Sequence, residues 1–150
     1  MLPDAVSSVL RRKSSDRHVL SIGPDASVYD AIALMAENSI GALLVVSNGA
    51  LVGIMSERDY ARKVVLQSRS SKDTQVSDIM STPVITVSPA HTVEECMRLM
   101  TDKRIRHLPV VDGATIAGIV SIGDLVRSMI TLQGETIQYL QQYINGQYQS

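Results

Sequence analysis

The sequence predicts an α/β fold of the α+β kind, made of two pseudo-symmetric repeats that pack through their sheets, with a short extra helix near each end. The main observation is a repeated motif: GIMSERD at residues 53–59 returns as GIVSIGD at residues 118–124, and the offset of 65 residues holds along most of both halves. Each half also reads as strand, helix, strand, strand, helix, with a turn signal between the paired strands. Such a repeat indicates two copies of one supersecondary unit.

The elements of the first half follow a short helix. Residues 4–13 have apolar side chains at helical spacing and basic residues in the last turn, where cations suit the helix dipole. We expect a strand over residues 19–22 and then a helix over residues 27–37, capped by Ser27 with Asp30 three residues later. The next expected elements are a buried strand at 42–46, a turn at Asn48-Gly49, a strand at 51–55 and a helix from Ser56 to about residue 66.

The second half repeats this order. We expect a strand at residues 84–87 and a helix at 92–103, because Thr92 and Glu95 form a capping-box pattern. The remaining expected elements are a strand at 107–111, a turn at Asp112-Gly113, a strand at 116–120, a helix at 122–131 and one more amphipathic helix beyond Gly134. The predicted segments are therefore 1–16 (helix and linker), 17–67 (first repeat), 68–81 (linker), 82–131 (second repeat) and 132–150 (helix and tail).

Composition excludes several classes of function. A net charge of −1 gives no electrostatic footprint for nucleic acid or an anionic membrane. The single cysteine, Cys96, rules out an internal disulfide framework, and its place on the apolar stripe of a helix favours a buried structural thiol. The scattered histidines lack metal-ligand spacing. No apolar run is long enough to span a bilayer, so we expect a cytoplasmic protein without nucleic-acid or membrane partners.

The repeated motif places a serine where a strand turns into a helix, and an aspartate in the first helical turn. The helix N-terminus presents unpaired N–H groups, which suit a phosphate at Ser56 or Ser121. A carboxylate such as Asp59 or Asp124 accepts two hydrogen bonds from a vicinal diol, so a ribose is its natural match. A capping pair that needs no ligand explains the same spacing, and the second copy favours a nucleotide site.

With this repeat and its paired motifs, residues 17–131 resemble a tandem pair of cystathionine β-synthase (CBS) domains, also called a Bateman module. The sequence RHLPVVD at residues 106–112 is similar to a common strand ending of that family. The resemblance implies a regulatory module that binds adenine nucleotides or related adenosyl compounds in two clefts between the repeats. In each cleft the aspartate is expected to hold the ribose and the serine to face the phosphate.

The family pattern implies two different sets of site residues. The first set surrounds Asp124 and consists of Ser121, Gly123, Ile122, Arg106, His107, Pro109, His18, Val19 and Leu20. The second surrounds Asp59 and consists of Ser56, Arg58, Ile40, Gly41, Ala42, Thr82, Pro83, Val84 and Ile85.

The two sets differ in positive charge. Because Arg106 and His107 correspond to Gly41 and Ala42, we expect the Asp124 cleft to bind more strongly. The Asp59 cleft then needs another cation, and Arg58 and Arg62 are candidates. Two plainer readings stay open: His107 as a half-buried strand residue bonded to backbone, and Arg58 as a solvated helix residue.

We therefore expect a non-enzymatic regulatory module, with no catalytic residues and no metal, that senses cellular energy or redox state. Its ligand would be AMP, ADP, ATP or NAD, and it would act as a homodimer on an unidentified regulated protein. The alternative is a constitutive interaction or assembly module with vestigial clefts. Binding of adenine nucleotides distinguishes the two.

Overall fold

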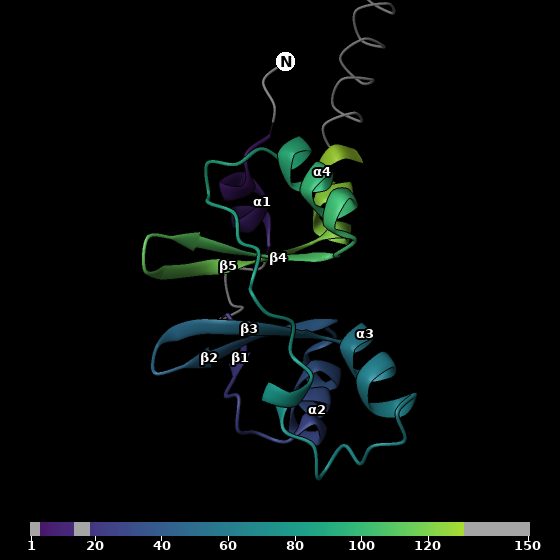
Figure 1. The fold of residues 1–150 in the computed structure, drawn as a ribbon. Coiled ribbons are helices and arrows are strands. Elements are labelled where there is room, and N and C mark those ends of the chain that lie inside the picture. The colour runs from purple at the N-terminus through teal and green to yellow at the C-terminus, as the bar shows by residue number, and fades with distance from the viewer. Residues whose placement is uncertain (1–3, 14–18, 131–150) are drawn as a thin grey trace, which may run out of the picture.

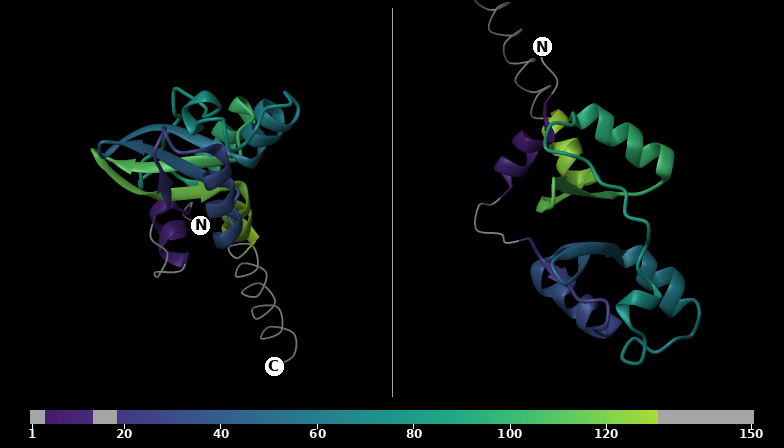
Figure 2. Two further views of the ribbon diagram at one scale, coloured as in Figure 1. Left: turned by 90° about the horizontal axis from the view of Figure 1, so that it is seen from below. Right: turned by 60° about the vertical axis from the view of Figure 1, so that its left-hand side comes forward.

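The computed structural model describes residues 4–13 and 19–130. The two repeats lie one above the other, with their sheets facing each other across the middle and their helices on the outside (Figure 1). The right-hand view of Figure 2 shows the same arrangement after a turn about the vertical axis. The predicted fold class and the packing of the repeats through their sheets are confirmed. His18 and the predicted helix beyond Gly134 lie outside the described residues.

The first repeat holds a three-stranded sheet in the order β1-β2-β3. Its elements are β1 (Ser21–Ile22), α2 (Val28–Asn38), β2 (Ala42–Ser47), β3 (Ala50–Ser56), α3 (Glu57–Tyr60) and a π-helical continuation, η1 (Ala61–Val65). The Asn48-Gly49 turn is confirmed, and both residues have the positive φ that this hairpin loop needs. The expected regular helix after Ser56 instead widens to π geometry after its first turn.

The second repeat holds a two-stranded sheet, β4 (His107–Asp112) and β5 (Thr115–Ser121), with α4 (Val93–Lys103) on its outer side. A last helix covers residues 122–130. The predicted turn is displaced by one residue. Asp112 pairs with Thr115, so the loop consists of Gly113 and Ala114, and Gly113 takes the positive φ of 62°.

The predicted strand at residues 84–87 is wrong, because only Val87 bridges to β4. The cause is Pro109, which stands where the first repeat has Leu44. Leu44 pairs with Ser21 of β1, whereas a proline has no N–H to donate to a neighbouring strand. Pro109 accepts one bond, from the N–H of Val87 at 3.0 Å, and the ladder does not extend toward residue 84.

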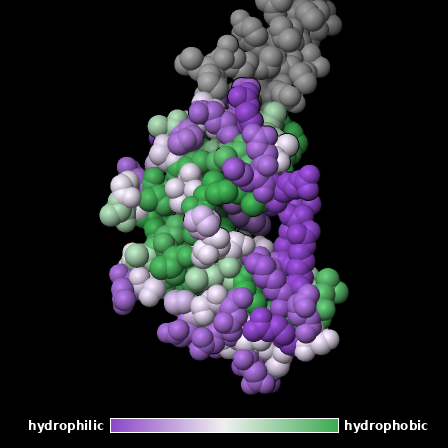
Figure 3. Space-filling model, viewed as in Figure 1, coloured by the Kyte–Doolittle hydropathy of each residue, from purple (hydrophilic) through white to green (hydrophobic). Residues whose placement is uncertain are grey.

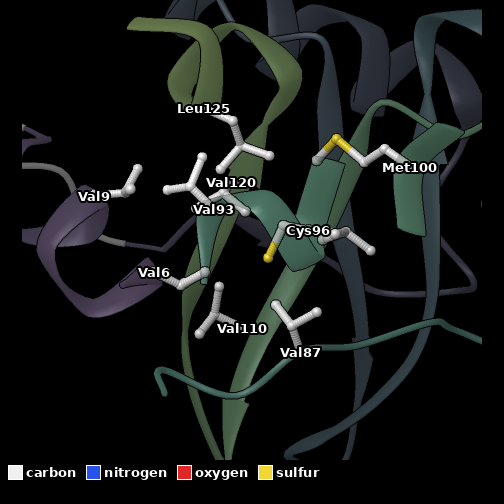
Figure 4. Close-up of a cluster of buried hydrophobic side chains, with 10 residues drawn as sticks. Val6, Val9, Val87, Val93, Cys96, Met100, Val110, Val120 and Leu125 are labelled. Carbon is white, nitrogen blue, oxygen red and sulfur yellow. The ribbon is translucent and has the colours of Figure 1, made fainter. Parts of the chain in front are cut away.

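The core of each repeat includes a short helical element from the segment that precedes the other repeat in sequence. Helix α1 (Val6–Arg12) packs on β5, and its Val6 and Val9 lie in the core of the second repeat (Figure 4). A 3-10 turn, η2 (Val76–Asp78), similarly brings Val76 and Ile79 into the core of the first repeat. The sequence analysis treated both segments as a terminal helix and a linker.

The segments that contain α1 and η2 pack closely against the glycines of the two motifs. A Cβ on Gly53 would lie 2.5 Å from the sulfur of Met80, and one on Gly118 would lie 2.9 Å from Cδ2 of Leu10. Glycine at these two positions therefore allows the segment after η2 and helix α1 to approach the strands closely. Cys96 is buried in the second core, where burial raises its thiol pKa to about 11, as suits a structural thiol. Within the described residues, no helix is both long and apolar enough to cross a bilayer.

Candidate functional site

Two clefts open between the repeats, one beside each motif aspartate. The cleft beside Asp59 has a volume of about 550 Å³, and the cleft beside Asp124 has a volume of about 380 Å³. Each is lined by residues of both repeats. Either volume is within the usual range for small-molecule sites. Within residues 4–13 and 19–130, no three metal-ligating side chains gather into a cluster.

The motif serine and aspartate form a capping box in both repeats. The backbone N–H groups of Ser56 and Ser121 donate to the carboxylates of Asp59 and Asp124 at 2.9 and 2.8 Å. The aspartate N–H groups donate back to the serine hydroxyls at 3.1 Å. The plainer reading of the motif as a capping pair is thus correct as local structure.

Burial distinguishes these two aspartates from ordinary caps. Among the described residues, Asp59 and Asp124 are the only buried carboxylates, each with 8% of its surface exposed. Helix caps are usually solvated, and a buried carboxylate needs several hydrogen-bond partners to offset its lost hydration. Each carboxylate can therefore accept several hydrogen bonds at its cleft, and the neighbouring donors differ between Asp59 and Asp124.

The Asp124 carboxylate is held by two cations of the chain. Lys13, at the end of α1, donates to it at 2.9 Å and to the carbonyl of Ile119 at 2.8 Å. Arg127 donates to the other oxygen at 2.5 Å. Burial acts to raise the pKa of Asp124, but the bonds from the Ser121 N–H and from Lys13 outweigh it, and the pKa lies below its usual value. A ribose at this carboxylate would have to compete with Lys13 or Arg127.

The Asp59 carboxylate has weaker internal partners. Lys63, one helical turn on, lies 3.1 Å from one oxygen, and the Ser81 hydroxyl donates to the same oxygen at 3.1 Å. The Lys63 ammonium also donates to the carbonyl of Ile79 at 2.9 Å, as Lys13 does to that of Ile119. The difference is that Asp59 has one cationic partner where Asp124 has two. A hydroxyl such as that of Ser81 is an easier group for a diol to replace than an ammonium ion.

Cations from both repeats line the Asp59 cleft: Arg58, Arg62 and Lys63 from the first, and Arg104 and Arg106 from the second. The guanidinium of Arg58 spans the boundary, since it donates to the carbonyl of Arg104 at 3.2 Å. A hydrophilic surface runs down the right-hand side of the molecule, where α3 lies in Figure 1 (Figure 3). This cleft is therefore suited to an anionic ligand.

His107 lies between the two clefts and lines both, as does Gly41. A Cβ on Gly41 would lie 3.6 Å from the His107 ring, so the two repeats meet closely at this point. Burial lowers the pKa of His107, Asp124 opposes this effect, and Lys13 and Arg106 reinforce it. His107 is half-buried, as one of the plainer readings expected, but within the described residues its side chain makes no hydrogen bond to backbone.

Some residues of each predicted set line the other cleft in the structure. Arg106 and Pro109, which were assigned to Asp124, line the Asp59 cleft, while Ile40 and Ala42, assigned to Asp59, line the Asp124 cleft. Side chains alternate along a strand. When one residue faces the core of its own repeat, its neighbours in the strand face the sheet of the other repeat. The start of each central strand therefore lines the cleft of the other repeat's aspartate.

Other predicted residues divide into those that line a cleft and those that do not. Ser121, Val19 and Leu20 line the Asp124 cleft, and Ser56, Arg58, Pro83 and Ile85 line the Asp59 cleft. Four predicted residues line neither cleft: Ile122, Gly123, Thr82 and Val84. Ile122 directly follows Ser121 at the start of the helix and so lies on a different face of it, and Gly123 has no side chain to reach the cleft.

Sequence reasoning missed several lining residues. Lys63 and Arg127 had a signal, because they lie one helical turn after Asp59 and Asp124 and so share a helix face with them. Lys13 and Ser81 had none, because only the crossing of α1 and η2 to the other repeat brings them to the carboxylates. Arg104 ends α4 in a left-handed conformation, with φ of 55°, which the sequence does not indicate.

Comparison with known proteins identifies relatives along the whole described chain. The CBS domain family matches residues 6–66 and 76–131. The CBS domain-containing protein CBSX3, mitochondrial, of Arabidopsis thaliana is 46% identical over 150 residues, which cover 95% of this chain and 73% of that protein.

Solved structures agree with this match. A protein with CBS domains from Burkholderia ambifaria MC40-6 superimposes with a TM-score of 0.82 and 53% identity, covering 85% of this chain and 94% of the other. The CBS domain pair of protein MJ0100, solved with 5′-methylthioadenosine and S-adenosyl-L-methionine, has a TM-score of 0.74 and 25% identity, covering 85% and 97%. The two matched segments, the two repeats and these relatives together place the chain in the CBS domain family, as a CBS domain pair.

Proposed function

We propose that this CBS domain pair is a regulatory module that binds adenine nucleotides in the clefts between its repeats. The ligand would be AMP, ADP, ATP or NAD, and its binding would report cellular energy or redox state to a protein not yet identified. The module would act without catalysing a reaction, in the cytoplasm. The observation that carries the proposal is the pair of buried aspartates, each at a cleft between the repeats.

Three features support this function. A buried carboxylate is a good acceptor for a ribose diol, and the serine N-cap beside it marks a helix N-terminus that favours phosphate. Both clefts are walled by apolar residues of the preceding segments, Ile85 and Pro83 in one and Val19 and Leu20 in the other, which suit an adenine ring. The MJ0100 domain pair, a structural relative, is solved with two adenosyl compounds.

We propose the reverse of the expected ranking of the two sites. The ranking rested on Arg106 and His107 beside Asp124, but Arg106 lines the other cleft and His107 lines both. Asp124 is also already paired with Lys13 and Arg127. We therefore propose that the Asp59 cleft binds more strongly.

Thermal unfolding with AMP, ATP and NAD tests the proposal. A ligand at 100 times its Kd adds about 2.7 kcal/mol to the free energy of unfolding, which raises Tm by roughly 5–10 °C in a chain of this size. Asp59→Ala should remove most of that rise and Asp124→Ala less. Each variant should lose about 1 kcal/mol without ligand, because the N–H of the capping serine loses its carboxylate acceptor.

The alternative is a constitutive assembly module, and the engagement of Asp124 by Lys13 and Arg127 favours it for that cleft. An unchanged Tm with all three nucleotides at millimolar concentration would reject the nucleotide-binding proposal in favour of this alternative. If Asp124→Ala proves the more damaging change, only the ranking of the clefts fails.

A further inference from the structure

The Asp59 cleft has an excess of positive charge that its own carboxylates do not offset. Five cations line it, Arg58, Arg62, Lys63, Arg104 and Arg106, against two carboxylates, Glu57 and Asp59. Lys63 is paired with Asp59. Among the described residues, Arg62, Arg104 and Arg106 form no ion pair with a carboxylate.

Gathering these charges from two repeats costs electrostatic free energy. Like charges in one cleft repel, and the repulsion is greater beside a low-dielectric wall than in open water. Solvated arginines on separate surfaces would avoid this cost. Arg58 donates to the backbone carbonyl of Arg104 at 3.2 Å, and both residues line this cleft, so an anion bound there would offset the repulsion among the arginines.

The negative and positive charges of the Asp59 cleft differ in burial. Asp59 is buried, whereas Arg58, Arg62, Arg104 and Arg106 are exposed. A phosphate near Asp59 would be repelled by the carboxylate, so the neutral ribose belongs beside Asp59 and the phosphates belong among the exposed guanidinium groups. Guanidinium groups also bind phosphate oxygens in a bidentate manner.

From these observations, and resting on the proposed function, we infer that the Asp59 cleft selects nucleoside polyphosphates over nucleoside monophosphates and uncharged nucleosides. A single phosphate can satisfy only part of the cation cluster, and each further phosphate adds negative charge where unpaired guanidinium groups lie. The Asp124 cleft should show less of this selectivity, because Lys13 and Arg127 both pair with Asp124, and the lining keeps one net positive charge where the Asp59 cleft keeps three.

Calorimetric titration with adenosine, AMP, ADP and ATP tests the inference, with EDTA present so that metal ions do not neutralise the phosphates. Affinity for the wild-type chain should rise along the series, and ATP should bind at least about tenfold more tightly than AMP at low ionic strength. Added salt should narrow that difference.

The double variant Arg104→Asn/Arg106→Gln removes two of the cations, and asparagine tolerates the left-handed backbone at position 104. It should lose about tenfold or more in ATP affinity and less than about threefold in adenosine affinity. The matched control, Arg11→Ala/Arg98→Ala, removes two exposed arginines that line neither cleft and should keep ATP affinity within about twofold. Thermal unfolding without ligand checks that both variants fold.

The possible outcomes distinguish failure of the proposed nucleotide binding from failure of the inferred polyphosphate selectivity. If no member of the series binds at millimolar concentration, the proposed function fails and this inference fails with it. If AMP or adenosine binds as tightly as ATP, nucleotide binding stands and the polyphosphate selectivity is rejected. Equal losses of ATP affinity in the variant and its control would also reject it, because the effect would then come from net charge and not from the cleft.

Discussion

At the residue scale, His107 is a titratable group at the boundary between the repeats, and the fold lowers its pKa. Its ring is half-buried between the two clefts, and burial lowers its pKa more than Asp124 restores it. Lys13 and Arg106 add to the lowering. At neutral pH the folded chain therefore holds an uncharged imidazole that lines both clefts.

This pKa predicts how stability depends on pH. The unfolded chain binds a proton at about pH 6.5, whereas the folded chain binds it only at lower pH. Because the unfolded state then carries more protons, the free energy of unfolding should fall as pH drops below about 6.5 toward the lower folded pKa. Urea unfolding at pH 7.5 and 5.5 measures the fall, and His107→Gln should make it smaller. An equal fall in wild type and variant would contradict the prediction.

At the element scale, α1 and η2 complete the cores of repeats to which they do not belong in sequence. The fit depends on the absence of a side chain at Gly118 and Gly53, where a Cβ would collide with Leu10 and Met80. Backbone bonds also fix α1, since the N–H of Val6 donates to the carbonyl of His91 at 2.8 Å. The contact of α1 with the second repeat is thus both apolar and hydrogen-bonded.

The close approach of α1 predicts the effect of Gly118→Ala. The added methyl group would displace Leu10, and the strain should lower the free energy of unfolding by about 1–3 kcal/mol. Gly23→Ala is the matched control: nothing lies within 4 Å of a Cβ at that position, so its effect should be near zero or slightly stabilising.

A double-mutant cycle identifies Leu10 as the source of the strain. In a Leu10→Ala background, Gly118→Ala should cost less than it does alone, because the colliding methyl groups are gone. Urea unfolding of the four chains measures the coupling. Additive losses would mean that the strain arises elsewhere than at the contact of α1 with β5.

At the scale of the whole molecule, the last described helix leaves an apolar face exposed. Ile122, Val126, Met129 and Ile130 are at helical spacing, and each has more than a third of its surface exposed. We propose that this face forms the interface of a homodimer, because a two-fold axis is the commonest way to cover such a surface. Light scattering should therefore give about twice the chain mass of 16.3 kDa.

Val126→Glu/Ile130→Glu should shift the mass toward one chain, since a charge in an apolar interface is costly. Tyr29→Glu is the control, because Tyr29 is equally exposed but lies on α2 of the other repeat. A wild-type mass of one chain would reject the dimer, and an unchanged mass in the double variant would place the interface elsewhere.

The sequence alone determined the repeat, the alternation of strands and helices, and the capping boxes at Ser56 and Ser121. These features depend on interactions over three to seven residues or on a fixed period, which a sequence displays directly. The buried carboxylates could be found the same way, because Asp59 and Asp124 recur at the motif spacing. Even the absence of a strand ladder before Val87 could have been predicted, from the proline at position 109.

Only the tertiary structure decided which residues share a cleft. The packing of the two sheets face to face carries Arg106 to Asp59, while the crossing of α1 carries Lys13 to Asp124. Both results depend on contacts between segments about fifty to a hundred residues apart, and no local pattern encodes them. The charges of the clefts, and with them the expected ligand, follow from that packing and not from the motifs.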